Sequence, residues 1–391
     1  MRAAGKKWIL PVIVISQFFC TSLWFAGNAI LPDLIKNLEL SANVLANLTS
    51  AVQFGFITGT LSFALFTIAD RFSPSRVFFA SAVIAALFNL VMGVPGISFS
   101  GLLVSRFFTG FFLAGIYPIG MKIASDHFQQ GLGKSLGFLV GALVLGTAFP
   151  HLLKNLAGML PWRNIVYAVS ALSFVGGLSM LLLVPDGPHR KPVMELKASA
   201  FLVGFQNEKF RAAAFGYFGH MWELYAFWAF VPVILTMYNN QHPQLRLNVS
   251  FFSFIIIACG AAACVLSGLM SQKYGAKKIA GISLMLSGLC CLLSPYFLLN
   301  ASAFVLLLYL LFWGLVVIAD SPLFSTLVAQ AAPDQSRGTS LTIVNCIGFS
   351  ITIISIQLVN FLMPRFDARN VFVVLAIGPL MGLIALYKKR G

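Results

Sequence analysis

Charged residues are scarce in this sequence. Only 9% of its 391 residues are Asp, Glu, Lys or Arg, whereas 59% are hydrophobic. A typical soluble domain has about 25% charged residues. A chain of this composition cannot cover a surface in water with polar groups, so a soluble fold is excluded. The sequence therefore predicts an all-α protein embedded in a lipid bilayer.

Several chemical signatures are also missing. All six cysteines lie within apolar runs, so an exterior disulfide framework is not expected. No GxxxxGK[ST] loop occurs, which argues against an ATP site. No metal-ligand cluster or nucleophile–base set stands out, so we expect neither a metal nor a cofactor, and an enzyme is the least favoured class. The first apolar run is too long for a signal peptide and lacks a small-residue cleavage site, so no cleavable signal is expected.

What the sequence does contain is a series of long apolar runs. A helix needs about 20 mostly apolar residues to cross a bilayer, and turn signals divide the chain into twelve such runs. The first six are 9–32, 46–69, 77–96, 101–125, 133–153 and 163–184; the second six are 210–236, 249–272, 278–299, 303–328, 338–363 and 370–388. The pattern predicts two six-helix bundles, 1–184 and 210–391, joined by a linker at 185–209.

Basic residues indicate the orientation. With the N-terminus inside, nineteen of the 26 Lys and Arg residues fall on the cytoplasmic side, where positive loops are retained. Both termini and the 185–209 linker are therefore expected to be cytoplasmic. The basic residues are scattered over many loops, so the formal charge of +15 reflects topology and lipid headgroups, and no nucleic-acid partner is expected.

The two halves repeat at an offset of about 200 residues. Five short matches occur in the same order: Ala26 and Pro32 with Ala226 and Pro232, 70–76 with 272–278, 117–118 with 321–322, 133–136 with 338–341, and 163–167 with 369–373. The offset drifts only from 200 to 206. A duplication of six helices is one recurring plan of secondary transporters.

Over nearly its whole length the chain resembles the major facilitator superfamily. The stretch ADRFSPSR keeps Asp70, Arg71 and Arg76 of the family's loop signature after helix 2, with Phe66 and Ser73 at two usual glycine positions. Its second copy, GLMSQKYGAKK, keeps Lys277 and Lys278 but has Gln at the acidic position. RFFTGFFLA is similar to the Arg-x-x-x-Gly pattern of helix 4, whereas the helix 5 run GFLVGALVLGTAFP lacks the Gly-Pro pair of the antiporter motif.

The resemblance implies roles for these loop residues. Asp70 at the cytoplasmic end of a helix is able to cap a neighbouring helix or pair with a basic residue across the loop. We expect a conformational lock, made in one state and broken in the other. Its predicted members are Asp70, Arg71, Arg76, Lys277 and Lys278. The alternative is a solvated loop turn with no such role.

Ionisable residues within the apolar runs mark the candidate site. GHMWELYAFW places His220 and Glu223 three residues apart, and Glu223 falls about 18 Å into its span at about 1.5 Å per residue. Such intramembrane residues default to functional candidates. In the superfamily helices 1, 4, 7 and 10 line a central cavity, which implies a proton-coupling set and a substrate-binding set. The first is Glu223, His220 and Asp320; the second is Arg106, Trp24, Asn28, Tyr117 and Asp320.

The function that these features predict is secondary active transport. A small solute would cross by alternating access, coupled most simply to protons. Ion-independent facilitated diffusion and a non-transporting sensor or assembly factor on the same fold remain alternatives. We expect a monomeric, multi-pass protein of a bacterial inner membrane, whose partners are the solute, the proton and the bilayer. The solute itself is not readable from the sequence.

Overall fold

The computed structural model describes residues 8–40, 44–128, 132–158, 160–190, 204–332 and 337–388. The described residues form helices joined by short turns, with no strand among them. The chain divides into two compact units, Met1–Leu196 and Lys197–Gly391. That division falls inside the predicted 185–209 linker. The predicted all-α class is confirmed.

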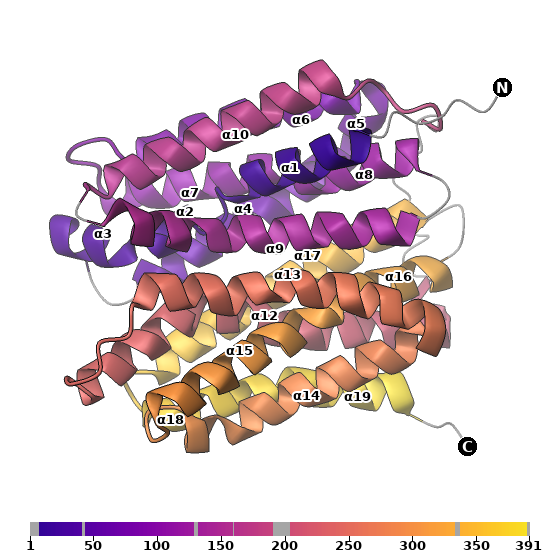
Figure 1. Ribbon diagram of the computed structural model, residues 1–391. Helices are drawn as coiled ribbons and strands as arrows, with labels where there is room; N and C mark the ends of the chain where they lie inside the picture. Colours follow the sequence, from indigo (N-terminus) through magenta and orange to yellow (C-terminus); the bar gives the residue numbers. More distant parts are fainter. Residues whose placement is uncertain are drawn as a thin grey trace. The chain divides into compact units, whose positions relative to one another are not determined.

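The described residues of the first unit form ten helical segments, coloured indigo to magenta in Figure 1. They are α1 (Ile9–Thr21), α2 (Ala26–Ala29), α3 (Leu31–Leu38), α4 (Val44–Leu65), α5 (Ile68–Arg71), α6 (Pro74–Val91), α7 (Phe99–Leu113), α8 (Tyr117–His127), α9 (Leu132–Ala157) and α10 (Arg163–Leu183). Helix α4 packs along α7, α6 packs along α10, and α1 lies against both α9 and α10.

The second unit contains the longest helix of the described chain, α12. Its segments are α12 (Glu208–Gln241), α13 (Val249–Tyr274), α14 (Ala276–Phe297), α15 (Ala303–Ala319), α16 (Ser321–Ala331), α17 (Arg337–Leu362), α18 (Ala368–Val371), the 3₁₀ turn η2 (Phe372–Ala376) and α19 (Ile377–Tyr387). Helix α12 packs against α17 and α19, while α15 lies between α13 and α14. Figure 1 shows these helices in red to yellow.

Eleven helical segments of the described chain are long and apolar enough to span a membrane. Inside such a span every backbone group must find its partner within the helix or in neighbouring protein. Polar caps begin several of the helices: Ser98 Oγ accepts from Gly101 N at 3.1 Å, and Asn248 Oδ1 accepts from Phe251 N at 3.0 Å. The remaining predicted span, 9–32, is not one continuous helix. It is divided into α1, α2 and the beginning of α3, and the twelve-helix fold accommodates this interruption.

Two further spans are interrupted at equivalent places. The predicted helix 101–125 is divided into α7 and α8, and the predicted helix 303–328 into α15 and α16. In each case a proline, Pro118 or Pro322, stands in the first turn of the second piece. Proline has no N–H to donate and restricts the residue before it. The turns at 114–116 and at Asp320 therefore end the preceding helices.

Helix crossings confirm that the two units share one plan. A Cβ atom on Gly110 of α7 would lie 2.0 Å from the carbonyl oxygen of Val52 on α4. A Cβ atom on Gly314 of α15 would lie 2.1 Å from the carbonyl oxygen of Ile256 on α13. Both residue pairs are offset by 204, as are Pro118 and Pro322. Glycine permits the backbones to touch at these crossings, as small residues do between membrane helices.

Candidate functional site

Arg106 of α7 is buried in the first unit and bound by backbone carbonyls. Its Nη2 donates to the carbonyl oxygens of Leu23 at 3.0 Å and Trp24 at 2.5 Å, and Nη1 donates to Asn89 Oδ1 at 3.2 Å. Leu23 and Trp24 lie in the turn between α1 and α2. Carbonyls at a helix break lack intrahelical donors, and the guanidinium supplies them. The ion-pair contacts of the described residues give Arg106 no carboxylate partner.

The same break carries two other predicted substrate contacts. Asn28 of α2 donates its side-chain N–H to Thr49 Oγ1 at 3.0 Å, and the ring centroid of Trp24 lies 4.8 Å from that of Phe56. Thr49 and Phe56 are both on α4. These contacts place Trp24 and Asn28 along one face of α4. Tyr117 lies at the start of α8 and is partly buried.

Gln53 is a polar residue on that face of α4 that the sequence reasoning missed. It lies between Thr49 and Phe56 at helical spacing, and it is fully buried. Neither its amide nitrogen nor its amide oxygen has a hydrogen-bond partner among the described residues. Buried polar side chains are normally paired. The signal was available, because Gln53 lies four residues after Thr49 in an otherwise apolar run.

Glu223 of α12 is held by two donors in the second unit. Trp313 Nε1 of α15 donates to its Oε1 at 2.6 Å, and Ser287 Oγ of α14 donates to its Oε2 at 2.8 Å. All three side chains are buried. The predicted sets contain Glu223, but neither Trp313 nor Ser287. A serine in an apolar helix gives no signal of its own, since its hydroxyl is able to bond to its own helix backbone.

His220 and Asp320 form a second buried pair. His220 Nδ1 lies 2.7 Å from Asp320 Oδ1, and each side chain is 1% exposed. Asp320 is the N-cap residue of α16, yet its carboxylate makes no cap hydrogen bond. Aspartate at this position usually accepts from the first-turn N–H groups. Here the carboxylate instead approaches the imidazole of α12, so the break in the helix places Asp320 in the site.

The structure therefore separates the predicted proton-coupling residues into two contacts. His220 was expected to act beside Glu223, because three residues on a helix share a face. The ring instead approaches Asp320, while Glu223 contacts Trp313 and Ser287. Both contacts join α12 to the broken helix α15–α16. The contact between Nδ1 and Oδ1 is a close approach without hydrogen-bond geometry, and all four polar side-chain atoms of His220 and Asp320 are without a hydrogen-bond partner among the described residues.

The residues predicted to form the conformational lock each have a partner outside the predicted set or are exposed. Asp70 pairs with Lys122 Nζ of α8 at 3.0 Å, and Lys122 also lies 3.7 Å from Asp126. Arg71 Nε donates to Thr67 Oγ1 at 2.9 Å. Arg76 is exposed, Lys277 lies over the ring of Tyr387 at 5.4 Å, and Lys278 is exposed. The acid of this loop is thus paired with a lysine of α8 that the sequence analysis did not assign to the lock.

The segment after α10 crosses the same end of the first unit. His189 N donates to the Asp126 carbonyl oxygen at 3.0 Å, and His127 Nε2 lies 2.9 Å from the Pro185 carbonyl oxygen. Residues 185–190, predicted as the start of a linker, therefore contact α8. Residues 191–203 lie outside the described residues. Among the residues that are described, no group of three or more His, Cys, Asp or Glu is placed to hold a metal ion.

A family model decides the classification. The model described as Major Facilitator Superfamily matches residues 13–212 and 213–390. This chain belongs to the major facilitator superfamily. Its place in this transporter family confirms the resemblance and distinguishes it from enzymes.

Relatives within the superfamily are distant. An uncharacterized transporter of Schizosaccharomyces pombe is 22% identical over 385 residues, covering 90% of this chain and 75% of that protein. A protein of Escherichia coli named as a probable galactarate/D-glucarate transporter is 22% identical over 307 residues, covering 69% of this chain and 67% of that protein.

Solved structures of the superfamily share the fold at low identity. The proton:xylose symporter XylE matches with a TM-score of 0.77 at 12% identity, covering 97% of this chain and 94% of that chain. The human organic anion transporter MFSD10 matches with a TM-score of 0.74 at 15% identity, covering 97% of this chain and 98% of that chain. These likenesses establish the fold and leave the solute open.

Proposed function

We propose that this superfamily member moves a small polar solute across the membrane by alternating access coupled to protons. The observation that carries the proposal is the His220–Asp320 pair, 2.7 Å apart and buried at the break between α15 and α16. Ionisable groups at such depth mark proton and substrate pathways. Histidine is also a common proton shuttle in proteins.

The broken helix supports a coupling between proton and movement. Asp320 belongs to the turn between α15 and α16, whereas His220 belongs to the continuous helix α12. A change in the angle between the two pieces would separate the imidazole from the carboxylate. Protonation of Asp320 weakens its attraction for His220, so proton binding would favour the separated arrangement. This is the differential interaction that a population shift requires.

Glu223 is proposed as the second member of the proton-coupling set. In the observed arrangement both carboxylate oxygens accept hydrogen bonds, and an indole N–H donates but does not accept. A proton on Oε2 is compatible with this arrangement, because the Ser287 hydroxyl is able to accept as well as donate and Oε1 still accepts from Trp313. Glu223 thus contacts α15 through Trp313, and α12 and the broken helix α15–α16 hold both proposed coupling contacts.

Solute contacts are proposed for Trp24, Asn28, Tyr117 and Asp320, with Gln53 added from the structure. Arg106 stays in the set only as a group that positions the α1–α2 break, because its Nη atoms are engaged by protein oxygens. The named solutes of the relatives suggest first probes. We propose galactarate, D-glucarate and D-xylose, which all offer hydroxyl groups to amide and indole donors.

The cellular setting is proposed from the charge distribution. The excess of Lys and Arg in alternate loops supports cytoplasmic termini. A bacterial inner membrane and a monomeric state stay part of the proposal without support from the charges. A cysteine at position 246, between α12 and α13, should react with an impermeant maleimide on intact cells. Five of the six native cysteines are buried and Cys259 is partly buried, so background labelling should be low. Labelling only after lysis would reverse the proposed orientation.

The transport proposal is tested with proteoliposomes that contain the purified protein and a trapped pH indicator. Each of the three probes is added outside at equal pH on both sides. A proton-coupled carrier produces a solute-dependent change of internal pH, and an imposed pH gradient drives accumulation of the same solute. Solute uptake without either effect would establish facilitated diffusion. No uptake of any probe, extended to a library of small polar metabolites, would favour the non-transporting alternative.

A further inference from the structure

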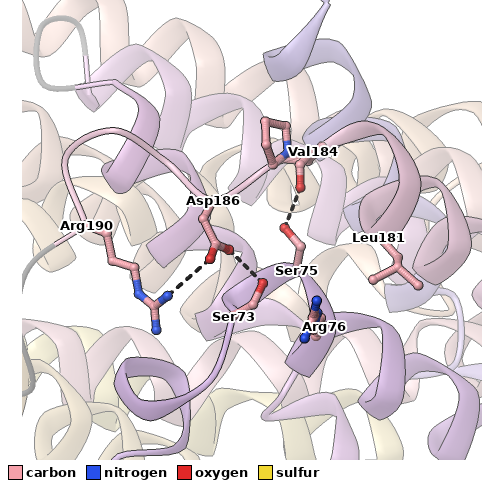
Figure 2. A pocket seen from close by; sticks show the side chains of 8 residues that line it. Ser73, Ser75, Arg76, Leu181, Val184, Asp186 and Arg190 are labelled. Atoms are coloured by element: carbon pink, nitrogen blue, oxygen red, sulfur yellow. Dashed lines mark hydrogen bonds and ion pairs between the residues drawn. The ribbon is translucent and has the colours of Figure 1, made fainter.

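A polar groove lies in the first unit where the start of α6 meets the end of α10. It encloses a cavity of about 410 Å³, and Figure 2 shows the side chains around it. Its lining residues are Ser73, Ser75, Arg76, Leu181, Val184, Pro185, Asp186 and Arg190. Arg76 is one of the predicted lock residues, but none of the lining residues belongs to the proposed coupling or solute sets. The groove therefore needs an explanation of its own.

The charges around the groove do not balance. Asp186 accepts from Ser73 Oγ at 2.6 Å and from Arg190 Nη1 at 3.1 Å, as the dashed lines of Figure 2 show. Arg190 Nη2 donates to the carbonyl oxygens of Asp70 and Phe72, both at 2.7 Å. Asp186 and Arg190 thus satisfy each other and the backbone. Arg76 is exposed and has no hydrogen bond or ion pair within the described part of the chain, which leaves one uncompensated cation.

The start of α6 adds to this positive potential. Ser73 is its N-cap residue, but the Ser73 hydroxyl bonds to Asp186 and caps no N–H group. Ser75 Oγ is also engaged, donating to the Val184 carbonyl oxygen at 2.7 Å. The helix spans 18 residues, and its N-terminal end carries the positive end of the macrodipole. Arg76 and the N-terminal turn of α6 therefore favour an anion in the groove.

Exposed apolar side chains continue from the groove along both helices. Arg76, Ala80 and Leu87 follow one another on the exposed face of α6, and Leu87 is 57% exposed. On α10, Leu182 is 69% and Leu183 is 46% exposed next to the lining residue Leu181. In a membrane helix such surfaces face lipid chains. The cation thus stands where a lipid-facing surface ends.

We propose that this groove binds the headgroup of an anionic phospholipid. Arg76 would contact the phosphate, the first turn of α6 would support it, and the acyl chains would lie along the exposed faces of α6 and α10. Arginine is suited to phosphate because its planar fork donates two parallel hydrogen bonds, and basic pockets between membrane helices bind lipid headgroups. The site is independent of the transported solute.

The test compares three probes on the full-length protein purified in detergent. Phosphatidylglycerol supplies both phosphate and chains, diacylglycerol supplies chains alone, and sodium phosphate supplies the anion alone. We expect phosphatidylglycerol to raise the melting temperature in a saturable manner, and the other two to have little effect at the same concentration. Arg76→Gln should need about fivefold more phosphatidylglycerol for half-maximal stabilisation.

Arg246→Gln is the matched control. It removes one positive charge from an exposed loop residue between α12 and α13, far along the chain from the groove, and should titrate like the unchanged protein. Arg76→Lys keeps the charge but lacks the planar fork of arginine. The phosphatidylglycerol concentration that it needs for half-maximal stabilisation should lie between those of the unchanged protein and Arg76→Gln. Equal weakening by Arg76→Gln and Arg246→Gln would reduce the effect to general electrostatics and overturn the proposal. Equal stabilisation by diacylglycerol, or by sodium phosphate, would also overturn it, in favour of a chain-binding surface or a free-phosphate site.

Discussion

Asp320 stands at the interruption of one helix and reaches His220 on another, with 2.7 Å between Oδ1 and Nδ1. The carboxylate leaves the first turn of α16 uncapped to do so. An N-cap side chain contributes about 1 kcal/mol to a helix, and that contribution is given up here. Functional sites often depart from local structural preferences in this way. Here the buried contact with His220 replaces the N-cap hydrogen bond that Asp320 would otherwise make.

The first prediction concerns this pair. Asp320→Asn and His220→Gln should each reduce solute accumulation driven by a pH gradient, because either change removes a titrating partner. Asp320→Asn should also raise the solute concentration needed for half-maximal uptake, since Asp320 is a proposed solute contact. The double variant should be no worse than the more affected single variant, because residues in contact do not act independently. Solute uptake into proteoliposomes is measured for the two single variants and the double variant. If the losses of accumulation add up in the double variant, the two residues act separately.

The second prediction concerns Glu223. Glu223→Gln should fold and bind solute, because the amide keeps the shape and one acceptor for Trp313. It should lose pH-gradient-driven accumulation, since an amide does not titrate, while exchange of solute for solute survives. Trp313→Phe is the companion variant, because it removes the donor to Oε1 and leaves the acid. It should retain coupling with an altered pH profile. Continued accumulation by Glu223→Gln would make Glu223 a structural acid.

The third prediction concerns Arg106. Arg106→Met keeps an unbranched side chain about as long as the aliphatic part of arginine, but leaves the carbonyls of Leu23 and Trp24, and the amide oxygen of Asn89, without this donor. Each buried group that loses its partner costs about 1–3 kcal/mol, so the melting temperature should fall by several degrees. Lys36→Gln removes a charge from an exposed position and should leave it unchanged. A stable Arg106→Met protein with impaired solute binding would return Arg106 to the solute-binding set.

The fold was largely predictable, because apolar length and the offset between the repeats are properties of the sequence itself. Pro118 and Pro322 marked the pieces of the two broken helices as a matching pair. The side-chain partners were less predictable. Helical spacing placed His220 beside Glu223 on one face, but it does not report which neighbouring helix each residue meets. Ser287 and Lys122 were missed for this reason, since their roles depend on packing between helices. Gln53 was missed although its spacing from Thr49 was visible in the sequence.

The fourth prediction concerns the crossings of the two units. Gly110→Ala and Gly314→Ala should each destabilise the protein, because the new Cβ atom would lie about 2 Å from a backbone carbonyl oxygen and the helices would have to separate. Gly268→Ala is the control, because nothing lies within 4 Å of its Cβ position. Alanine there should be neutral or stabilising by about 1 kcal/mol. Thermal unfolding in detergent measures the stability of the three variants. An unchanged melting temperature for both Gly110→Ala and Gly314→Ala would contradict the close contacts.

The last prediction concerns Asp70 and Lys122. Their ion pair is partly exposed, with 26% and 21% of the two side chains accessible, and such pairs contribute about 1 kcal/mol or less. If the pair forms in only one state of the transport cycle, its loss should shift the equilibrium between states by up to about fivefold. Asp70→Asn should produce that shift without abolishing solute binding. Lys122→Gln should shift it in the same direction, and the double variant should shift it no further.

Spin-label distances between the ends of α8 and α16 report the populations of the two states. The carbonyl of Asp70 still accepts from Arg190 in these variants, so the segment after α10 should stay in place. Unchanged distances with normal transport would make Asp70 an ordinary loop residue, and shifts that add in the double variant would assign the two residues to different partners.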